Sequence, residues 1–166
     1  MVCGVGSDEL IDCILASCLD EDDQVLIPYP SFSMYSEFTL LNNGMGIKVP
    51  LKSDFTYDIE AMKKVIEEKQ PKVIFICNPN NPTGMLYPKE VLEELIQVAR
   101  EFEILLFVDE IYDRLVMDGL KHISLASLAD DIPIVTMNGL SKSHCLCGYR
   151  CGWMVISGPR HLTEEY

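Results

Sequence analysis

The sequence has no long apolar run and few basic residues. No stretch approaches the roughly 18 uncharged, apolar residues that a membrane-spanning helix needs, so we expect no membrane partner. Lysine and arginine number 13 against 26 acidic residues, which gives a net charge of −13. The basic residues are scattered rather than gathered into a patch, and we therefore predict no nucleic-acid partner.

A cysteine framework is also missing. The seven cysteines show no disulfide spacing, and Cys145 and Cys147 form C-x-C rather than the C-x-x-C of zinc sites. No secretory signal is visible, so we interpret the cysteines as reduced thiols and expect a cytoplasmic protein without a metal site.

What is present is a globular composition, with 48% hydrophobic and 23% charged residues. A chain of 166 residues is long enough to bury the core of one domain. The ends are abrupt, because a glycine-rich turn follows residue 1 at once and residues 159–166 look like the first turn of a helix. We therefore expect residues 1–166 to be one domain from the middle of a larger protein.

Apolar runs alternate with amphipathic segments along the chain. Buried strands are predicted at residues 24–28, 46–51, 72–77, 104–108, 132–137 and 152–156. Helices are predicted after Ser7, over 33–41, around 59–66 and over 88–102. Near-continuous apolar strands are typical of parallel sheets covered on both faces. The pattern predicts an α/β fold with a doubly wound, mostly parallel sheet flanked by helices.

Polar side chains follow three consecutive predicted strands, beginning with KVIFIC. Asn81 follows the first of these strands, Asp109 and Tyr112 follow the second, and Ser141 and Lys142 follow the third. Ligands bind open α/β sheets beyond the carboxyl ends of the strands. We therefore expect these side chains to meet at one edge of the sheet.

Taken alone, each residue also fits a structural role. Asp109 suits a cap of the turn after its strand, and Asn81 suits a tight turn. Tyr112 fits packing, and Lys142 fits a solvated surface lysine. The stronger argument for a binding site is that all of these side chains follow consecutive strands and should meet at one edge of the sheet.

A helix start follows the segment GVG. We predict Ser7 as its N-cap, with Asp8 and Glu9 well placed in the first turn. Free N–H groups at such a start also offer a site to an anion. Because GVGSDE lacks the third glycine of the dinucleotide fingerprint, a nucleotide-binding domain is only an alternative.

Together the set matches the needs of one cofactor. Pyridoxal 5'-phosphate requires a lysine amine for a Schiff base and an acid for its pyridine nitrogen. It also needs donors to its ring hydroxyl, an aromatic face and an anion pocket. The chain offers Lys142, Asp109, Asn81, Tyr112, an aromatic residue of YPSFSMY, Ser7, Ser141 and Arg150.

The segments GVGSDE, YPSFSMY, NPNNPTG, VDEIYD and NGLSKSHCLCGYRCGW, in this order and spacing, resemble the large-domain core of class I/II aminotransferases of fold type I. The motifs most specific to this family are NPNNPTG and a Ser-Lys pair that is followed by an arginine eight residues after the lysine. The first third is most similar to histidinol-phosphate aminotransferases. The last third is more like alanine aminotransferases, so the resemblance leaves the amino donor open.

The resemblance implies a role for each residue. Lys142 would form the Schiff base and then move the proton of the substrate Cα. Asp109 would keep the pyridine nitrogen protonated, and Asn81 and Tyr112 would hydrogen-bond the ring hydroxyl. Phe32 would stack on the ring.

The resemblance also places the phosphate at the helix start. Backbone N–H groups of Ser7 and Asp8, the Ser141 hydroxyl and the planar fork of Arg150 would hold it. We expect the Asp8 carboxylate to point away from the anion.

For the full-length protein the resemblance implies amino acid and 2-oxo acid substrates and a homodimer. The N-terminal arm and the C-terminal small domain of the family are absent from this sequence. Two alternatives stay open, namely a β-elimination lyase on the same core and a truncated, non-catalytic fragment that binds cofactor weakly.

Overall fold

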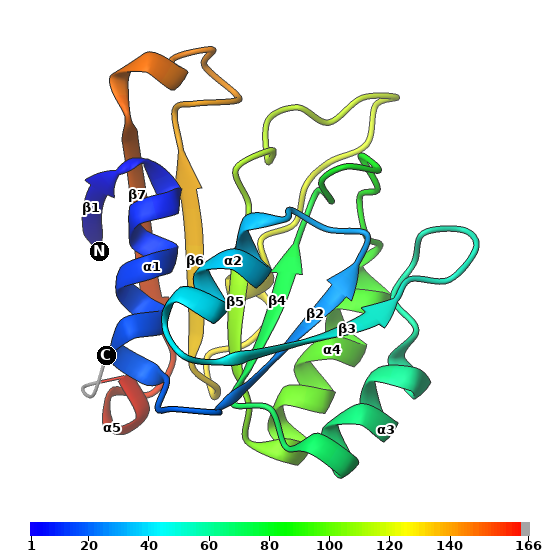
Figure 1. The fold of residues 1–166 in the computed structure, drawn as a ribbon. Coiled ribbons are helices and arrows are strands. Elements are labelled where there is room, and N and C mark those ends of the chain that lie inside the picture. Colours follow the sequence, from blue (N-terminus) through cyan, green and yellow to red (C-terminus); the bar gives the residue numbers. More distant parts are fainter. Residues whose placement is uncertain (164–166) are drawn as a thin grey trace.

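A computed structural model describes residues 1–163 and contains one seven-stranded sheet in the order β1-β7-β6-β5-β4-β2-β3 (Figure 1). The strands are β1 (Val2–Val5), β2 (Gln24–Tyr29), β3 (Met45–Pro50), β4 (Val73–Cys77), β5 (Leu105–Asp109), β6 (Ile134–Gly139) and β7 (Cys151–Ser157). Strand β7 pairs antiparallel with both neighbours, and all pairings from β6 to β3 are parallel. The predicted mostly parallel sheet is confirmed.

Helices cover both faces of this sheet. They are α1 (Gly6–Cys18), α2 (Met34–Leu41), α3 (Ile59–Lys69), α4 (Lys89–Phe102) and α5 (Arg160–Thr163), with short 3-10 helices η1 (Leu125–Ser127) and η2 (Cys147–Tyr149). Helices α1 and α2 share one apolar cluster with the sheet, whereas α3 and α4 share the other. The doubly wound prediction is therefore confirmed. None of the helices in residues 1–163 has the length and apolar character to cross a membrane.

The central strands β4 and β5 are buried along their whole length. In β4, Ile74 and Ile76 pack into the α3/α4 cluster, whereas Phe75 and Cys77 pack into the α1/α2 cluster. Successive side chains of a strand point to opposite faces. Because both faces are covered, both sets must be apolar, and this explains the uninterrupted apolar runs in the sequence.

Residues 2–5 form an edge strand where we expected only a glycine-rich turn. This strand, β1, pairs with β7 through its backbone, with Gly4 opposite Gly152. The side chains of Val2 and Val5 are exposed. The strand therefore carries no alternation of buried and exposed residues from which it could be predicted.

The predicted N-cap role of Ser7 is wrong. Helix α1 begins at Gly6, and Val5 occupies the cap position without a capping side chain. A carboxylate oxygen of Glu9 accepts instead from the Val5 amide at 2.6 Å. Ser7 therefore lies inside the first turn, where it is buried and where backbone N–H groups have no partner within the helix.

Two glycines let the start of α1 lie directly against the start of β7. A Cβ atom at Gly152 would overlap the carbonyl carbon of Gly6 and lie 2.5 Å from the nitrogen of Ser7. Gly6 has a φ of 80°, and a Cβ there would meet Nη2 of Arg150 at 2.5 Å. The glycines thus bring the helix N-terminus next to Arg150.

We expect Gly152→Ala to lower the free energy of unfolding by about 1–3 kcal/mol, because the added methyl group overpacks a contact between two backbones. Urea denaturation monitored by circular dichroism measures this change. Gly148→Ala is the matched control, since a Cβ at Gly148 meets nothing within 4 Å. Equal stabilities of the two variants would contradict the inferred close packing.

Candidate active site

The loops that follow β4, β5 and β6 meet at one end of the sheet, beside the start of α1 (Figure 1). A cavity of about 100 Å³ lies there. Its walls are formed by Ser7, Asp8, Phe32, Cys77, Asn81, Asp109, Ile111, Tyr112, Ser141, Lys142, Cys147 and Arg150. All nine residues proposed from the sequence line this cavity, and Cys77, Ile111 and Cys147 are additions.

Asp109 ends the buried strand β5 and is only 4% exposed. Phe107, two residues earlier, packs toward α1 and α2, so Asp109 faces the same side. The Tyr35 hydroxyl donates to its Oδ2 at 2.8 Å, and the Ile111 amide donates to its Oδ1 at 3.1 Å. Asp109 therefore caps the turn after its strand, as the simpler interpretation proposed, and also lines the cavity.

The surroundings of Asp109 favour a positive charge nearby. Burial raises the pKa of this carboxyl group above its ordinary value. The hydrogen bonds from Tyr35 and Ile111 lower the pKa, as does the positive charge of Lys142. A second cationic group in the cavity would lower it further, so the carboxylate is an acceptor for a protonated ligand.

Tyr35 is the side-chain partner of Asp109 and was not proposed from the sequence. Its ring stacks on Phe75 with centroids 4.4 Å apart, and Phe32 meets it edge-on at 5.4 Å. Burial, and then the nearby Asp109, raise the pKa of Tyr35 well above its ordinary value. The phenol therefore stays protonated and donates. The available signal was that a buried tyrosine needs a hydrogen-bond partner.

Lys142 lies in the turn after β6, at the mouth of the cavity. Its side chain is exposed, and its Nζ lies 6.0 Å from the centre of the Tyr112 ring. The Cys145 amide donates to the Lys142 carbonyl oxygen at 3.1 Å and closes the turn. The exposure fits the solvated-lysine interpretation, while the position on the cavity wall is the one that the family resemblance implies.

Asn81 is held in the loop that follows β4. Its backbone N–H donates to the sulfur of Cys77 at 3.3 Å. Burial raises the pKa of the Cys77 thiol to about 12, so this acceptor stays uncharged. The neighbouring Asn80 accepts from both the amide and the hydroxyl of Thr83. The loop is thus fixed by its own side chains, and Asn81 serves as the expected turn residue while lining the cavity.

Arg150 follows η2 with a left-handed φ of 50° and leads into β7. Its Nη2 lies 3.2 Å from Oδ2 of Asp8, and its Nη1 donates to the carbonyl oxygen of Cys147 at 3.2 Å. The expectation that the Asp8 carboxylate points away from this position is wrong. Since both side chains are more than 40% exposed, the ion pair is weak and an anion can compete for the arginine.

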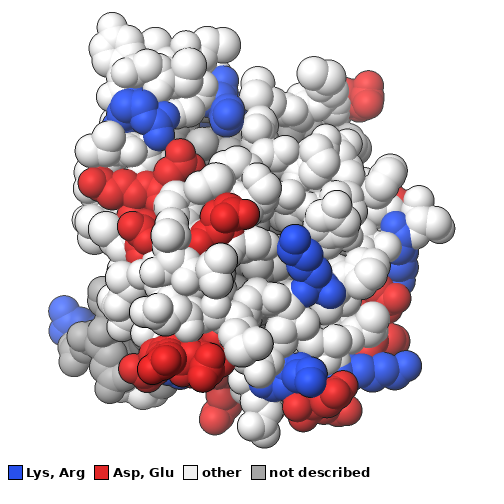
Figure 2. All heavy atoms as spheres, in the orientation of Figure 1, with Lys and Arg blue, Asp and Glu red and all other residues white. Residues whose placement is uncertain are grey.

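Charged side chains are dispersed over the molecule. On the face shown in Figure 2, basic side chains form separate small groups with acidic side chains among them. That face has no broad basic patch of the kind that holds a nucleic-acid backbone. Within residues 1–163, no group of three or more His, Cys, Asp or Glu side chains could hold a metal ion.

The sequence matches the family "Aminotransferase class I and II" over residues 1–162. The chain belongs to this family. Two curated relatives are similar over 165 residues, which is 98% of this chain. They are the glutamate-pyruvate aminotransferase AlaA of Haemophilus influenzae, 38% identical, and the alanine aminotransferase of Mycobacterium tuberculosis, 42% identical. The chain spans about two fifths of the length of these relatives, 41% and 38%.

Solved aminotransferases share the fold. An Escherichia coli aminotransferase superposes with a TM-score of 0.94 at 36% identity, covering 99% of this chain and 41% of its own. The alanine aminotransferase of Pyrococcus furiosus superposes with a TM-score of 0.91, also at 36% identity, covering 98% and 42%. The sheet of this chain is therefore the aminotransferase sheet, and the predicted family resemblance is confirmed.

We expect Tyr35→Phe to lower the free energy of unfolding at neutral pH by about 1–3 kcal/mol, because the buried Asp109 carboxylate loses a hydrogen bond. The folded-state pKa of Asp109 is raised, so its ionisation destabilises the protein as pH rises through that value. Removing the phenol raises this pKa further. The loss should therefore be smaller at acid pH, where the carboxyl group is protonated.

Urea denaturation at pH 4 and pH 7 measures the difference between the two conditions. Tyr149→Phe is the matched control, because Tyr149 is 79% exposed. A loss for Tyr35→Phe that is the same at both pH values would contradict the pairing of its hydroxyl with an ionised Asp109.

Proposed function

We propose that this chain is the cofactor-binding core of a pyridoxal 5'-phosphate-dependent aminotransferase. The reaction would transfer an amino group from an amino acid to a 2-oxo acid. The observation that carries the proposal is the shared cavity. It is lined by the exposed Lys142, by the buried Asp109 and by Arg150, which lies beside the start of a helix. Membership in the class I and II family supports it, because that family works with this cofactor.

The side chains around the cavity fit the chemistry of this cofactor. A protonated ring nitrogen needs an acid, and Asp109 has a lone pair left on each oxygen after its bonds to Tyr35 and Ile111. Burial raises the pKa of Asp109, and a cationic partner would lower this pKa by stabilising the charged form. The residues present therefore suit the group.

When bound, pyridoxal phosphate supplies an aldehyde that joins amines and a ring that takes up electrons from the substrate Cα. Lys142 would hold the aldehyde carbon through its Nζ. Once displaced by a substrate amine, the same Nζ would accept the proton from the substrate Cα. Asp109 would retain the proton on the ring nitrogen throughout.

Other side chains of the cavity would orient the ring and its anionic tail. Asn81 and Tyr112 would donate to the ring oxygen, and Phe32 would cover a ring face. The tail would meet the first-turn N–H groups of α1, the Ser141 hydroxyl and Arg150. Arg150 would then bind the anionic tail either in place of Asp8 or together with it, since its ion pair with Asp8 is exposed.

For the substrates we propose alanine or glutamate as amino donor and pyruvate or another 2-oxo acid as acceptor. The support is the names of the relatives from Haemophilus influenzae and Mycobacterium tuberculosis. We further propose that residues 1–166 are the large-domain part of a longer enzyme that works as a homodimer, with the small domain supplied by sequence outside this chain.

We expect the 166-residue chain to form an absorbance band in the visible range with pyridoxal phosphate, and Lys142→Ala to abolish it. Borohydride reduction followed by mass spectrometry should find the cofactor on Lys142. Lys64→Ala is the matched control, because Lys64 is an exposed lysine on α3. A wild-type chain without a band would sink the proposal that this chain binds the cofactor.

We expect Asp109→Asn to slow amino transfer on the order of 10²-fold, because an amide cannot stabilise the charge on the ring nitrogen. The measurement is single-turnover release of pyruvate from alanine by the cofactor-loaded protein, with Asp130→Asn as an exposed control. A β-elimination lyase needs a substrate with a leaving group on Cβ, so release of pyruvate together with ammonia from serine would favour the lyase alternative over amino transfer.

A further inference from the structure

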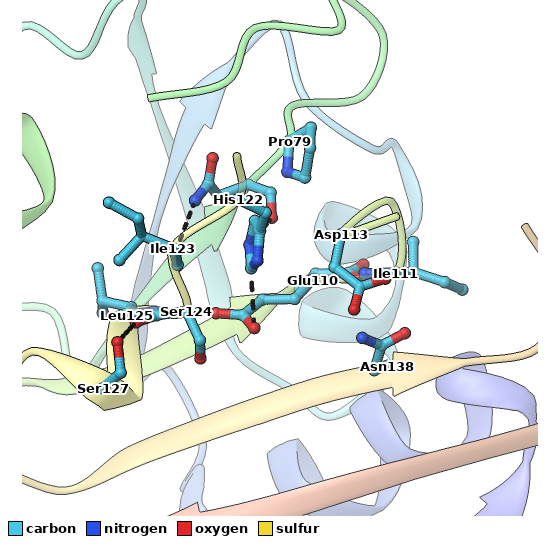
Figure 3. Close-up of polar contacts among 12 residues, drawn as sticks. Pro79, Glu110, Ile111, Asp113, His122, Ile123, Ser124, Leu125, Ser127 and Asn138 are labelled. Carbon is cyan, nitrogen blue, oxygen red and sulfur yellow. Dashed lines mark hydrogen bonds and ion pairs between the residues drawn. The ribbon is translucent and has the colours of Figure 1, made fainter. Parts of the chain in front are cut away.

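Glu110 lies next to Asp109 but on the opposite side of the sheet. It is only 4% exposed, and Val108, two residues earlier, packs into the α3/α4 cluster. Its Oε1 accepts the amide hydrogen of Leu125 at 3.0 Å, and the close-up shows the carboxylate between Leu125 and His122 (Figure 3). None of the roles assigned above uses this buried acid.

The bond from Leu125 to Glu110 closes a long segment on itself. Residues 110–125 leave β5 at Glu110 and return to the sheet at Leu125, which is fully buried at the start of η1. The Glu110 amide donates to the Met137 carbonyl oxygen on β6 at 2.9 Å. One residue thus fixes both ends of the segment that carries Tyr112 into the cavity.

His122 ties this segment to the loop after β4. Its Nε2 lies 3.1 Å from the carbonyl oxygen of Asn78 and 4.0 Å from Oε2 of Glu110 (Figure 3). A carbonyl oxygen can only accept, so Nε2 carries the proton. The Asn78 side chain adds a bond to the Ile123 carbonyl oxygen at 3.5 Å and accepts from the Tyr87 amide at 3.2 Å. Asn78 opens the loop that carries Asn81.

We propose that Glu110 is a positioning residue for the candidate site. By closing residues 110–125 and, with His122, fastening them to Asn78, it sets the distance between Tyr112 and Asn81. This proposal rests on the proposed function, in which those two side chains donate to one oxygen of the cofactor. Glu110 itself contacts neither the cavity nor the reacting atoms.

The electrostatics indicate hydrogen bonds rather than an ion pair. Burial raises the pKa of Glu110 to about 7, helped by the charges of Asp113 and Asp109 and opposed by the bonds from Leu125 and Ser124. Burial lowers the pKa of His122, although Asp113 acts against it. An uncharged glutamine, which keeps the acceptor oxygen and the shape, should therefore replace Glu110 well.

The first test measures the hydrogen bond between the Leu125 amide and Glu110 in the absence of any cofactor. In the 166-residue chain, hydrogen exchange measured by NMR should be about tenfold or more faster at the Leu125 amide in Glu110→Ala, because its acceptor is gone. The exchange rate of the Leu125 amide should stay close to the wild-type rate in Glu110→Gln. It should also stay close in Glu94→Ala, a control at an exposed glutamate on α4. An unchanged Leu125 rate in Glu110→Ala overturns the proposal.

The second test follows the cofactor. We expect the pH at which the visible band of bound pyridoxal phosphate titrates to rise in Glu110→Ala, as in Tyr112→Phe, because the ring oxygen loses donors to its anionic form. Glu110→Gln should restore the wild-type midpoint. Faster exchange at Leu125 with an unchanged midpoint would make the role of Glu110 purely structural and overturn the proposal.

A second variant covers the case in which Glu110→Ala does not fold. His122→Ala removes only the hydrogen bond to the Asn78 carbonyl oxygen. It should also raise the pH at which the visible band titrates, and an unchanged value would contradict the proposal. A wild-type chain without any band would overturn the proposed function, and with it the role of Glu110 toward the cofactor. The exchange rate at Leu125 reports the closure separately, so the two failures are distinguishable.

Discussion

The candidate site depends on one buried carboxylate. Asp109 sits at the end of a strand that has no polar residue before it, and it is 4% exposed. An ionised carboxylate in such a place costs several kcal/mol, of the order of 3–5 or more, when its partner is removed. The fold offsets this cost with hydrogen bonds from the Tyr35 hydroxyl, in the first turn of α2, and from the Ile111 amide. Elements far apart in the sequence are therefore held around a single negative charge, with Lys142 across the cavity.

The alternation of side chains along a strand places two neighbouring acids on opposite faces of the sheet, where they have different partners. Asp109 and Glu110 are consecutive, so their side chains point to opposite faces of the sheet. Asp109 meets the cavity on the α1/α2 side, whereas Glu110 meets Leu125 and His122 on the α3/α4 side. Both acids have raised pKa values because both are buried. A one-residue shift of β5 would exchange them and remove the acid from the cavity, so the register of this strand couples the site to the loops behind it.

The sequence is informative where one physical rule decides the outcome, and less so where several residues must cooperate. Buried parallel strands show as apolar runs, and polar residues at their carboxyl ends converge, so Asn81, Asp109 and Lys142 could be placed together before the fold was known. Strand β1 could not be predicted, because its side chains do not alternate in burial and only backbone pairing with β7 forms it. The prediction of Ser7 as the cap of α1 was wrong although Ser7 is a good cap by type, because the glycine contact with β7 lets the helix start two residues earlier, with Val5 at the cap position. The partners Tyr35 and His122 depend on distances across the fold that no local pattern contains.

The walls of the cavity carry groups of both charges. Arg150 and the free N–H groups of the first turn of α1 attract an anion. The Asp8 carboxylate that pairs with Arg150 belongs to an exposed contact worth about 0–1 kcal/mol, so a phosphate with two or more acceptor oxygens can replace it at little cost. The buried Asp109 carboxylate gains from a protonated group, because a nearby positive charge lowers its raised pKa. A ligand that pairs with both groups would carry an anion and a cation, as the proposed cofactor does. A simple nucleotide phosphate lacks the cation, whereas a phosphorylated pyridinium has both charges.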